Sequence, residues 1–459
     1  MNEVISTNTE FRHYFNEITE WIKGHALLFT IFIFVIVKII ALFTLITLFD
    51  YFDKSIGSTN LVIQSGNIFF DLLGTRWDSY FYLTIANNGM YVDPLRPDDT
   101  RIWNFSPLFP FCIRMLMDFA KLFQVEIPVA VAGVLVANFF SLTSTIAFFY
   151  MSRIYFDVEK AIGATLLFSF FPTIFVFSTV AYSEPVFITF SVLSWYFFEK
   201  KKYPFAGLSL ALASLARYPG ALIFFLYVPI YFGRKIKEKG LKEAFGCLIA
   251  IPLFPLLVIL KVAILISSQL ALKVRLVYFS KFYQKLSINE QKRKKFEQIM
   301  YFLDPGLSWV LIFGIIPLGW MIFVNTFAPE SLSEIAYNNW GGRFIFPFAG
   351  FFDSLNAGNV KWTLERFAFP VLLMVIGLFV LIKRPSIALL IIGQVLFYTG
   401  FIGLHTLSIP RYTGTIFHIH LVLAEELASN KMITLFCSFF LIYGFKVLWS
   451  FCNWDIWLI

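Results

Sequence analysis

The stretch ALLFTIFIFVIVKIIALFTLITL, from Ala26 to Leu48, decides the class of this fold. It is longer than the apolar core of a secretory signal, and no small-residue cleavage pattern follows it. A helix of about 20 apolar residues crosses the hydrocarbon layer of a bilayer. We therefore expect a first membrane span here, and not a targeting sequence that is removed.

Similar apolar runs recur as far as Trp449. Of the 459 residues, 58% are hydrophobic and 14% are charged, and the mean hydropathy is +0.74. No soluble core needs that much apolar surface, so we expect one all-α polytopic membrane domain over 1–459, with about 11–13 transmembrane helices, because only helices satisfy an open-ended backbone in lipid. The expected spans lie near 26–50, 127–151, 161–180, 184–198, 204–233 (broken at Pro219), 244–267, 307–326, 366–383, 386–403, 411–428 and 432–450.

The rest of the composition does not indicate binding of nucleic acid, metal or nucleotide. Aromatic residues make up 20% of the chain, which fits lipid-facing bulk and interfacial belts. The net charge of +8 does not indicate nucleic-acid binding, because the basic residues lie mainly in short loops between spans. The four cysteines and the histidines lack metal-ligand spacing, and no nucleotide motif occurs. We expect no metal, no cofactor and no nucleic acid.

Basic loops predict the orientation, because positive charge marks the cytoplasmic side. They contain Arg153 with Lys160, Lys200–Lys202, Arg234–Lys242, Lys292–Lys295 and Lys383 with Arg384. Loop 51–126 and the chain around Glu184, Arg217, 327–365 and His405–Tyr412 then lie outside. The polar residues of interest collect on that lumenal or extracytoplasmic face. Segment 268–300 is expected to be a basic cytoplasmic insertion, although 234–242 and 273–300 are separated by only one obvious apolar run, 244–267.

The first outer loop contains the segment Thr75-Arg76-Trp77-Asp78-Ser79. Residues 76–90 and 105–123 are too polar for spans and are predicted to form interfacial helices. In the first of these, Trp77, Tyr80, Phe81 and Tyr82 are expected to act as amphipathic anchors.

Asp78 is the main candidate for chemistry. A positioned carboxylate takes a proton from an attacking hydroxyl or orients that hydroxyl. The alternative is an Asp at a helix N-terminus that interacts with the helix dipole or with Arg76. Arg76 either contacts a phosphate or snorkels to the interface, and Trp77 either stacks on a sugar or belongs to an aromatic belt.

Other polar residues of the same face have two interpretations each. Asn104 and Ser106 lie in a proline-rich string and either bind sugar hydroxyls or cap the next helix. Glu184 either binds sugar hydroxyls or a cation, or faces water at a helix start.

Arg217 lies within a long apolar stretch, where an unpaired guanidinium is disfavoured, so it faces a cavity or has an anionic partner. Arg411 repeats this pattern on the same side. Two cations suit one lipid phosphate.

Six motifs in this order resemble the PIG-V family (GPI mannosyltransferase 2) and its prokaryotic relatives. They are Arg76-Trp77-Asp78, Trp103–Pro110, Tyr182–Pro185, Leu215–Gly220, Asn339–Arg343 and Pro410-Arg411-Tyr412. The resemblance runs from about Arg76 to the C-terminus. The sequence departs from the family at Asn104–Pro107, at Arg217-Tyr218 and in the basic insertion.

The resemblance implies a GT-C fold, a polyprenyl-phosphate mannose donor (dolichyl in eukaryotes) and inverting transfer to a glycolipid such as a GPI precursor. It places the essential Trp-Asp pair at Trp77 and Asp78. We assign the donor phosphate to Arg217, Arg411 and Tyr412. Substrate binding is assigned to Arg76, Asn104, Ser106, Glu184, Trp340 and Arg343.

Partners are expected to be the polyprenyl-phosphate sugar, the lipid-linked acceptor and membrane lipids, and a small membrane partner subunit is left open. The membrane is the endoplasmic reticulum if the source is eukaryotic and the plasma membrane if it is prokaryotic. Two other classes remain: a secondary transporter or lipid flippase, which would show paired broken helices, and a non-catalytic subunit of a glycosylation complex.

Overall fold

The computed structural model describes residues 20–52, 65–89, 91, 98–241, 306–340, 345–401, 408–427 and 429–453. Within these ranges the chain is helical and contains no strand. The all-α expectation is confirmed. The insertion 268–300 and the apolar run 244–267 lie outside the described residues.

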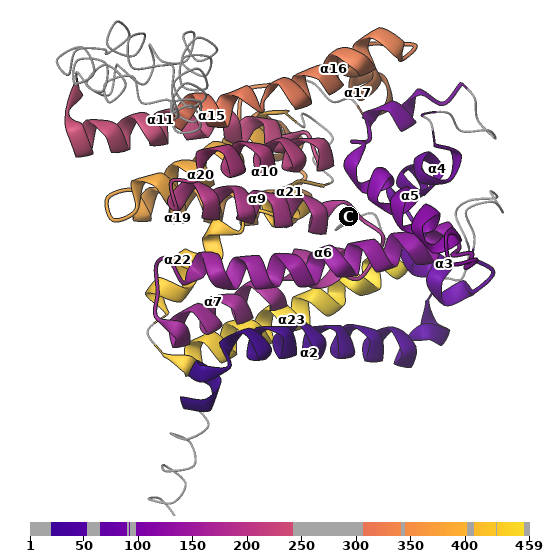
Figure 1. Ribbon diagram of the computed structural model, residues 1–459, viewed down its shortest axis with the longest axis horizontal. Helices are drawn as coiled ribbons and strands as arrows, with labels where there is room; N and C mark the ends of the chain where they lie inside the picture. Colours follow the sequence, from indigo (N-terminus) through magenta and orange to yellow (C-terminus); the bar gives the residue numbers. More distant parts are fainter. Residues whose placement is uncertain are drawn as a thin grey trace, which may run out of the picture.

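The described helices are arranged as one bundle (Figure 1). In the first half they are α2 (Ala26–Thr47), η1 (Phe49–Tyr51), α3 (Ile68–Gly74), α4 (Ser79–Asn88), η3 (Thr100–Asn104), α5 (Leu108–Lys121), α6 (Val129–Ser152), α7 (Val158–Phe170), α8 (Pro172–Phe177), α9 (Glu184–Glu199), α10 (Tyr203–Ala216) and α11 (Pro219–Lys239). In the second half they are α15 (Gly306–Ile312), α16 (Ile315–Phe327), α17 (Leu332–Trp340), α18 (Ala349–Asn356), α19 (Val360–Val380), α20 (Pro385–Phe401), α21 (Ile409–Thr413), α22 (His418–Glu426) and α23 (Asn430–Cys452).

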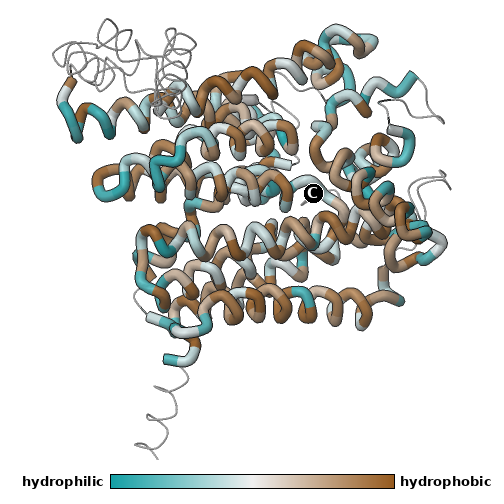
Figure 2. Tube along the Cα trace, viewed as in Figure 1, coloured by the Kyte–Doolittle hydropathy of each residue, from teal (hydrophilic) through white to brown (hydrophobic). Residues whose placement is uncertain are grey.

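Several of these helices are long and apolar enough to cross a bilayer. Among the described residues, five such segments occur, at Ala26–Thr47, Val129–Ser152, Gly306–Phe327, Thr363–Val380 and Asn430–Cys452. They run in roughly the same direction across the bundle, and the tube of α2 is hydrophobic along nearly its whole length (Figures 1 and 2). The protein is a multi-pass membrane protein. The count of about 11–13 spans stays a prediction.

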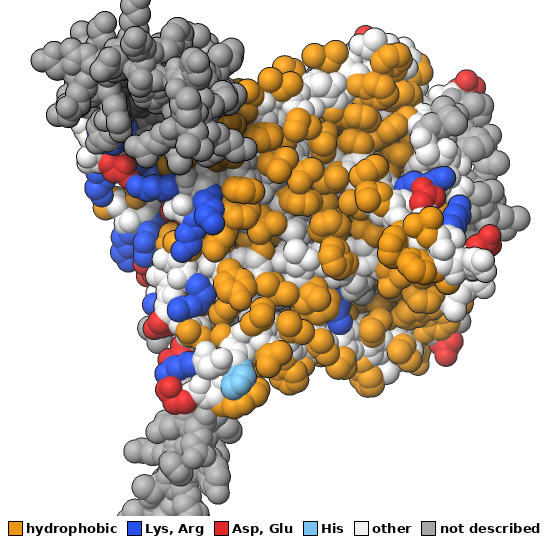
Figure 3. All heavy atoms as spheres, in the orientation of Figure 1, with side chains coloured by type: hydrophobic (Ala, Val, Ile, Leu, Met, Phe, Trp, Pro, Cys, Tyr) orange, Lys and Arg blue, Asp and Glu red, His pale blue; other side chains and the backbone are white. Residues whose placement is uncertain are grey.

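The two ends of the bundle differ in charge. Lys and Arg side chains gather at the left-hand end in Figure 3, where α9 ends and α10 begins. Ion pairs hold this end together: Arg234 to Glu199 at 2.6 Å and Arg384 to Glu425 at 2.9 Å. The short helices α3, α4 and α5 lie at the opposite end (Figure 1). The long helices therefore separate a basic end from the end that carries Asp78.

Two expected spans are divided in the structure. The stretch 161–180 forms α7 and α8, because Pro172 has no N–H to continue the first helix and begins the second one instead. The stretch 411–428 forms α21 and α22, with a turn at Gly414 between them. At Gly414 a Cβ would lie 2.0 Å from Thr173 Oγ1, so the turn packs directly on α8. The prediction of single helices was wrong at both places.

A lysine in the first span holds one of these breaks. Lys38 is buried, and its Nζ donates to the carbonyl oxygen of Ser178 at 2.5 Å and to its Oγ at 2.6 Å. Ser178 ends α8, where carbonyl groups lack helical partners. The ammonium therefore satisfies the end of α8 and fixes the segment that leads to Glu184.

The stretch 204–233 turns back on itself at its break. Helix α10 ends at Ala216, and α11 begins at Pro219, so Arg217 stands at the tip of a hairpin. Gly220 permits this turn, because a Cβ there would lie 2.5 Å from the backbone nitrogen of Ser214. The hairpin places Arg217 at the end of the bundle that carries Asp78.

Gly220→Ala is expected to lower the apparent melting temperature in detergent and to weaken activity, because the methyl group forces α11 away from α10. Overpacking of this kind costs about 1–3 kcal/mol. Gly233→Ala is the matched control on the same helix, since a Cβ at Gly233 meets nothing within 4 Å. Equal thermal shifts for the two variants would show that the close approach does not constrain the hairpin.

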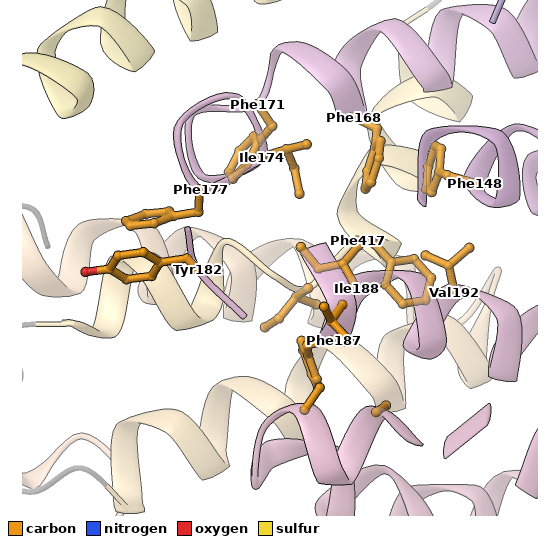
Figure 4. Close-up of a cluster of buried hydrophobic side chains, with 14 of the residues drawn as sticks. Phe148, Phe168, Phe171, Ile174, Phe177, Tyr182, Phe187, Ile188, Val192 and Phe417 are labelled. Carbon is orange, nitrogen blue, oxygen red and sulfur yellow. The ribbon is translucent and has the colours of Figure 1, made fainter. Parts of the chain in front are cut away.

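The core between the helices is aromatic (Figure 4). The ring of Phe148 on α6 stacks on Phe168 of α7 at 4.4 Å between centroids. Phe177 on α8 lies 5.1 Å from the ring of Tyr182. This packing joins α6 to α7 and α8 to the segment that leads to Glu184.

The first loop contains helices where they were predicted, but its side chains differ from the prediction. On α5, Phe111 and Phe119 are exposed, while Phe109 and Ile113 are fully buried. Apolar side chains therefore lie both on the side of the helix that faces the protein and on the exposed side. On α4, Tyr80 and Tyr82 are buried. The expectation that these two tyrosines are interfacial anchors was wrong, because both pack into the protein.

Candidate active site

Four charged side chains from four parts of the chain meet at the end of the bundle. Arg411 Nη2 donates to Asp78 Oδ2 at 2.8 Å, and Arg411 Nε lies 3.3 Å from Glu184 Oε1. Arg217 Nη1 pairs with the same Oε1 atom. The order is Asp78, Arg411, Glu184, Arg217. Two anions and two cations therefore balance in a region shielded from water.

Asp78 is the accessible member of this cluster. Its side chain is 31% exposed, whereas those of Arg411 and Glu184 are 3% and 1% exposed. Asp78 occupies the cap position of α4, but its carboxylate makes no capping hydrogen bond. The structure thus gives Asp78 a charged partner, Arg411, in place of the helix dipole or Arg76.

Glu184 holds both guanidinium groups. It begins α9 next to Pro185, and its burial is complete. Its Oε1 faces Arg217 and Arg411, while its Oε2 has no hydrogen-bond partner among the described residues. The alternative of a water-facing glutamate does not fit this burial.

Tyr412 lies against both cations. The guanidinium carbon of Arg217 is 4.7 Å from the ring centroid, and that of Arg411 is 4.8 Å away. Arg411 Nη2 also donates to the Tyr412 hydroxyl at 3.0 Å. Cation–π contacts of this kind are stronger where water is excluded. The ring of Tyr412 therefore packs against both guanidinium groups and holds them in position.

Three polar residues support the cluster and were not assigned to the site from the sequence. The Tyr82 hydroxyl is 2.7 Å from Ser183 Oγ, and Arg217 Nη1 donates weakly to that Oγ at 3.5 Å. The backbone N–H of Asp78 donates to the Tyr182 hydroxyl at 3.3 Å. Burial raises the pKa of both tyrosines, so both stay protonated. Tyr182 and Ser183 directly precede Glu184 in the sequence. Their position next to a site candidate could have indicated that they belong to the site.

Arg76 and Trp77 are directed toward the end of α23. Arg76 is buried, and its Nη1 donates to the carbonyl oxygen of Cys452 at 2.7 Å. Trp77 Nε1 donates to the carbonyl oxygen of Phe451 at 3.4 Å. Trp77 has a φ of 54°, which is rare for a bulky residue and costs of order 1–3 kcal/mol. This turn directs Asp78 toward Arg411, while Arg76 and Trp77 donate hydrogen bonds to the end of α23.

The remaining assigned residues are Asn104, Ser106, Trp340 and Arg343. Asn104 ends η3, and Ser106 is buried before α5. In the part of the chain that the structure describes, no hydrogen bond or ion pair joins either to the charged cluster. Arg343 and the side chain of Trp340 lie outside the described residues.

These features define a multi-pass membrane protein that builds a charged site at one end of its helix bundle. Residues 22–303 match the mannosyltransferase (PIG-V) family. The chain therefore belongs to the PIG-V mannosyltransferase family, and the predicted family is confirmed. The motifs Asn339–Arg343 and Pro410-Arg411-Tyr412 lie outside the matched residues.

Two further proteins are similar to this chain. GPI mannosyltransferase 2 of Schizosaccharomyces pombe is 27% identical over 158 residues, which make up 34% of this chain. The match spans 31% of that relative's length. The oligosaccharyltransferase AglB of Archaeoglobus fulgidus, solved with an inhibitory peptide and a dolichol-phosphate, has a TM-score of 0.44 and 14% identity, covering 94% of this chain and 56% of its own.

Proposed function

We propose that this protein is a GT-C mannosyltransferase that moves mannose from a polyprenyl-phosphate donor to the hydroxyl of a glycolipid, such as a GPI precursor. One observation carries the proposal: an accessible carboxylate, Asp78, contacts a buried guanidinium, Arg411. A transferase that uses a lipid phosphate needs a proton acceptor beside a phosphate-binding cation.

The reaction is a direct displacement with inversion. The acceptor hydroxyl oxygen forms a bond to the anomeric carbon while the bond from that carbon to the phosphate oxygen breaks. The hydroxyl proton goes to Asp78, and the leaving polyprenyl phosphate keeps the electron pair and a further negative charge. Arg411 and Arg217 stabilise that developing charge.

The resting contact between Asp78 and Arg411 has a chemical consequence. The guanidinium of Arg411, 2.8 Å from Asp78, holds the carboxylate in place before the donor binds. A donor phosphate competes for the same guanidinium. Donor binding therefore draws Arg411 away from Asp78 and leaves the carboxylate free to contact the acceptor hydroxyl.

The catalytic face is proposed to be lumenal or extracytoplasmic. Arg234, late in α11, and Arg384, which immediately precedes α20, form ion pairs at the basic end of the bundle, opposite the end that carries α4 (Figure 1). Positive loops face the cytoplasm. Labelling of single cysteines in sealed vesicles at Gln124 and at Lys201, both at helix ends, tests this, and the two must label from opposite sides.

The direct test is an assay of the purified protein with polyprenyl-phosphate mannose and a panel of glycolipid acceptors. The expected result is one product that gains one hexose, read by intact mass, and an inverted anomeric centre, read by NMR. Transport of lipid without hexose transfer would instead support the flippase alternative. Normal transfer by an Asp78→Ala variant would exclude this residue from catalysis.

Arg411→Lys is expected to raise the KM for the donor and to lower kcat, with a smaller loss than Arg411→Ala. Lysine keeps the charge but loses the planar fork that holds two anions at once. The KM for the acceptor should change much less than that for the donor. A donor KM equal to that of the wild type in both variants would contradict the phosphate role. Arg384→Lys, at the basic end, is the matched control.

A further inference from the structure

The chain between α8 and α9, residues 178–183, lies outside any helix and is completely buried. We call it the site segment. Its residues are at most 4% exposed, and it leads directly into Glu184, which faces both arginines of the charged cluster. Within it, the Tyr182 hydroxyl accepts a hydrogen bond from the backbone N–H of Asp78. The position of this segment therefore decides where groups of the candidate active site lie.

The site segment depends on distant parts of the chain for its hydrogen bonds, because buried backbone groups need partners and water does not reach them. The backbone N–H of Ala181 donates to the carbonyl oxygen of Leu73, near the end of α3, at 3.0 Å. At the start of the segment, Lys38 Nζ donates to the carbonyl oxygen of Ser178 at 2.5 Å and to Thr179 Oγ1 at 3.2 Å. Helices α2 and α3 thus hold the segment from two sides.

Helix α6 closes over the site segment on a further side. A Cβ on Gly133 of α6 would lie 3.0 Å from the Cβ of Ala181. Close packing of this kind transmits a displacement instead of absorbing it. A shift of the segment at Ser178 therefore passes along the chain toward Glu184.

A lysine is costly at position 38. It lies within the apolar helix α2 and is 8% exposed, and its three hydrogen bonds among the described residues go to uncharged oxygen atoms of Ser178 and Thr179. Charged side chains within spans are rare and mark functional positions. A methionine would continue the apolar span without burying an ammonium group. What the lysine adds is a set of charge-assisted hydrogen bonds, which are about twice as strong as neutral ones.

We propose that Lys38 is a positioning residue for mannosyl transfer, a role that rests on the proposed function. By holding Ser178 and Thr179, it fixes the start of the site segment, and through the segment it sets the places of Tyr182 and Glu184. In the described part of the chain, the hydrogen bonds of its ammonium go to the segment and not to the charged cluster. Lys38 therefore acts through the segment and does not touch the reacting groups.

Lys38→Met keeps the length of the side chain but removes the ammonium. It should lower kcat and raise the KM for the donor, with a combined loss of about 10- to 100-fold in kcat/KM, because a misplacement near 1 Å costs about a hundredfold. The melting temperature should stay close to that of the wild type, since the lost partner of Ser178 is offset by removal of a buried charge. Lys38→Arg, which restores a charged donor, should recover part of the activity.

Thr30→Val is the matched control. Thr30 is fully buried on the same helix, and its hydroxyl donates to the carbonyl oxygen of Ala26 within α2 itself. Its kinetics should equal those of the wild type. A lower melting temperature with an unchanged donor KM in Lys38→Met would show that Lys38 only stabilises the bundle, and would overturn the proposal.

A double-mutant cycle tests whether Lys38 acts through Ser178. Ser178→Ala removes the hydroxyl oxygen that lies 2.6 Å from Lys38 Nζ but leaves the carbonyl oxygen, so it should lower activity less than Lys38→Met does. Adding Ser178→Ala to Lys38→Met should cause little further loss, because the contact is already gone. Losses that multiply would mean that Lys38 acts elsewhere, and the proposal would be wrong.

Hydrogen exchange gives a readout that does not depend on mannosyl transfer. Amide protons in peptides that cover 178–184 should exchange faster in Lys38→Met than in the wild type, and Thr30→Val should leave them unchanged. Unchanged exchange in Lys38→Met, or faster exchange with wild-type kinetics, would overturn the proposal. If exchange rises as expected but the wild-type protein transfers no mannose, the hold of Lys38 on the site segment stands and the proposed function fails.

Discussion

Asp78→Asn should reduce mannosyl transfer by about 100- to 10,000-fold, the range that a general base contributes. Asparagine keeps the shape of the side chain but takes no proton and cannot pair ionically with Arg411. Asp78→Glu keeps the charge but moves it by one methylene, and a misplacement near 1 Å costs about a hundredfold. The expected order of kcat is wild type, then Glu, with Asn and Ala near background.

Loss of Asp78 should affect stability far less than activity. Its carboxylate is 31% exposed, and Arg411 keeps Glu184 as a second anionic partner. We expect a loss of about 1–2 kcal/mol or less. Asp118→Asn is the matched control, since Asp118 is an exposed carboxylate on α5 that pairs with Arg114. Its activity should equal that of the wild type.

The decisive readings are kcat and its pH dependence with saturating donor. If Asp78→Asn turns over at close to the wild-type rate, the general-base role is wrong. An Asp78→Asn enzyme that is slow but keeps the acidic limb of the wild-type pH profile would show that Asp78 orients the acceptor and does not take its proton.

Glu184→Gln should cause the largest loss of stability among single substitutions in the site. Arg217 and Arg411 are buried, and without the glutamate charge only Asp78 remains to balance both of them. Removing one partner from a buried ion network costs about 3–5 kcal/mol. The apparent melting temperature in detergent should fall clearly, and donor use should fall with it, because Arg217 and Arg411 lose the charged carboxylate that both of them face.

Glu425→Gln provides the comparison. Glu425 is 30% exposed and pairs with Arg384 at the basic end, so its loss should cost no more than about 1 kcal/mol. The double variant Glu184→Gln with Arg217→Gln should recover part of the stability, since it removes one uncompensated cation. Equal melting temperatures for Glu184→Gln and Glu425→Gln would refute the view of Glu184 as the centre of the cluster.

Much of the site was present in the sequence as separate motifs. Asp78, Glu184, Arg217 and Arg411 were candidates because charged residues at the ends of apolar runs are costly in lipid unless they have partners. Tyr412 was assigned to the donor phosphate together with Arg217 and Arg411. Their partners were not predictable. Asp78 and Arg411 lie 333 positions apart, and nothing in either motif selects the other.

The missed residues were those whose local pattern has a simpler explanation. Tyr82 resembles an interfacial anchor, since tyrosine commonly occupies that position, but packing of α4 buries it against Ser183. Lys38 lies within a strongly apolar run that predicts a span with or without it. Only the tertiary structure, which packs the end of α8 against α2, shows that Ser178 is the partner of the Lys38 ammonium.

The sequence by itself determined the helical, membrane-spanning class, the family, and the break at Pro219. These depend on the length of apolar runs and on proline and charge, which act locally. The tertiary structure alone decided that Arg411 pairs with both Asp78 and Glu184, that 411–428 is two short helices, and that α19 and α23 enclose a cavity beside Arg411. Each of these depends on contacts between segments distant in sequence, and the register of such contacts is set by how whole helices pack and not by local composition.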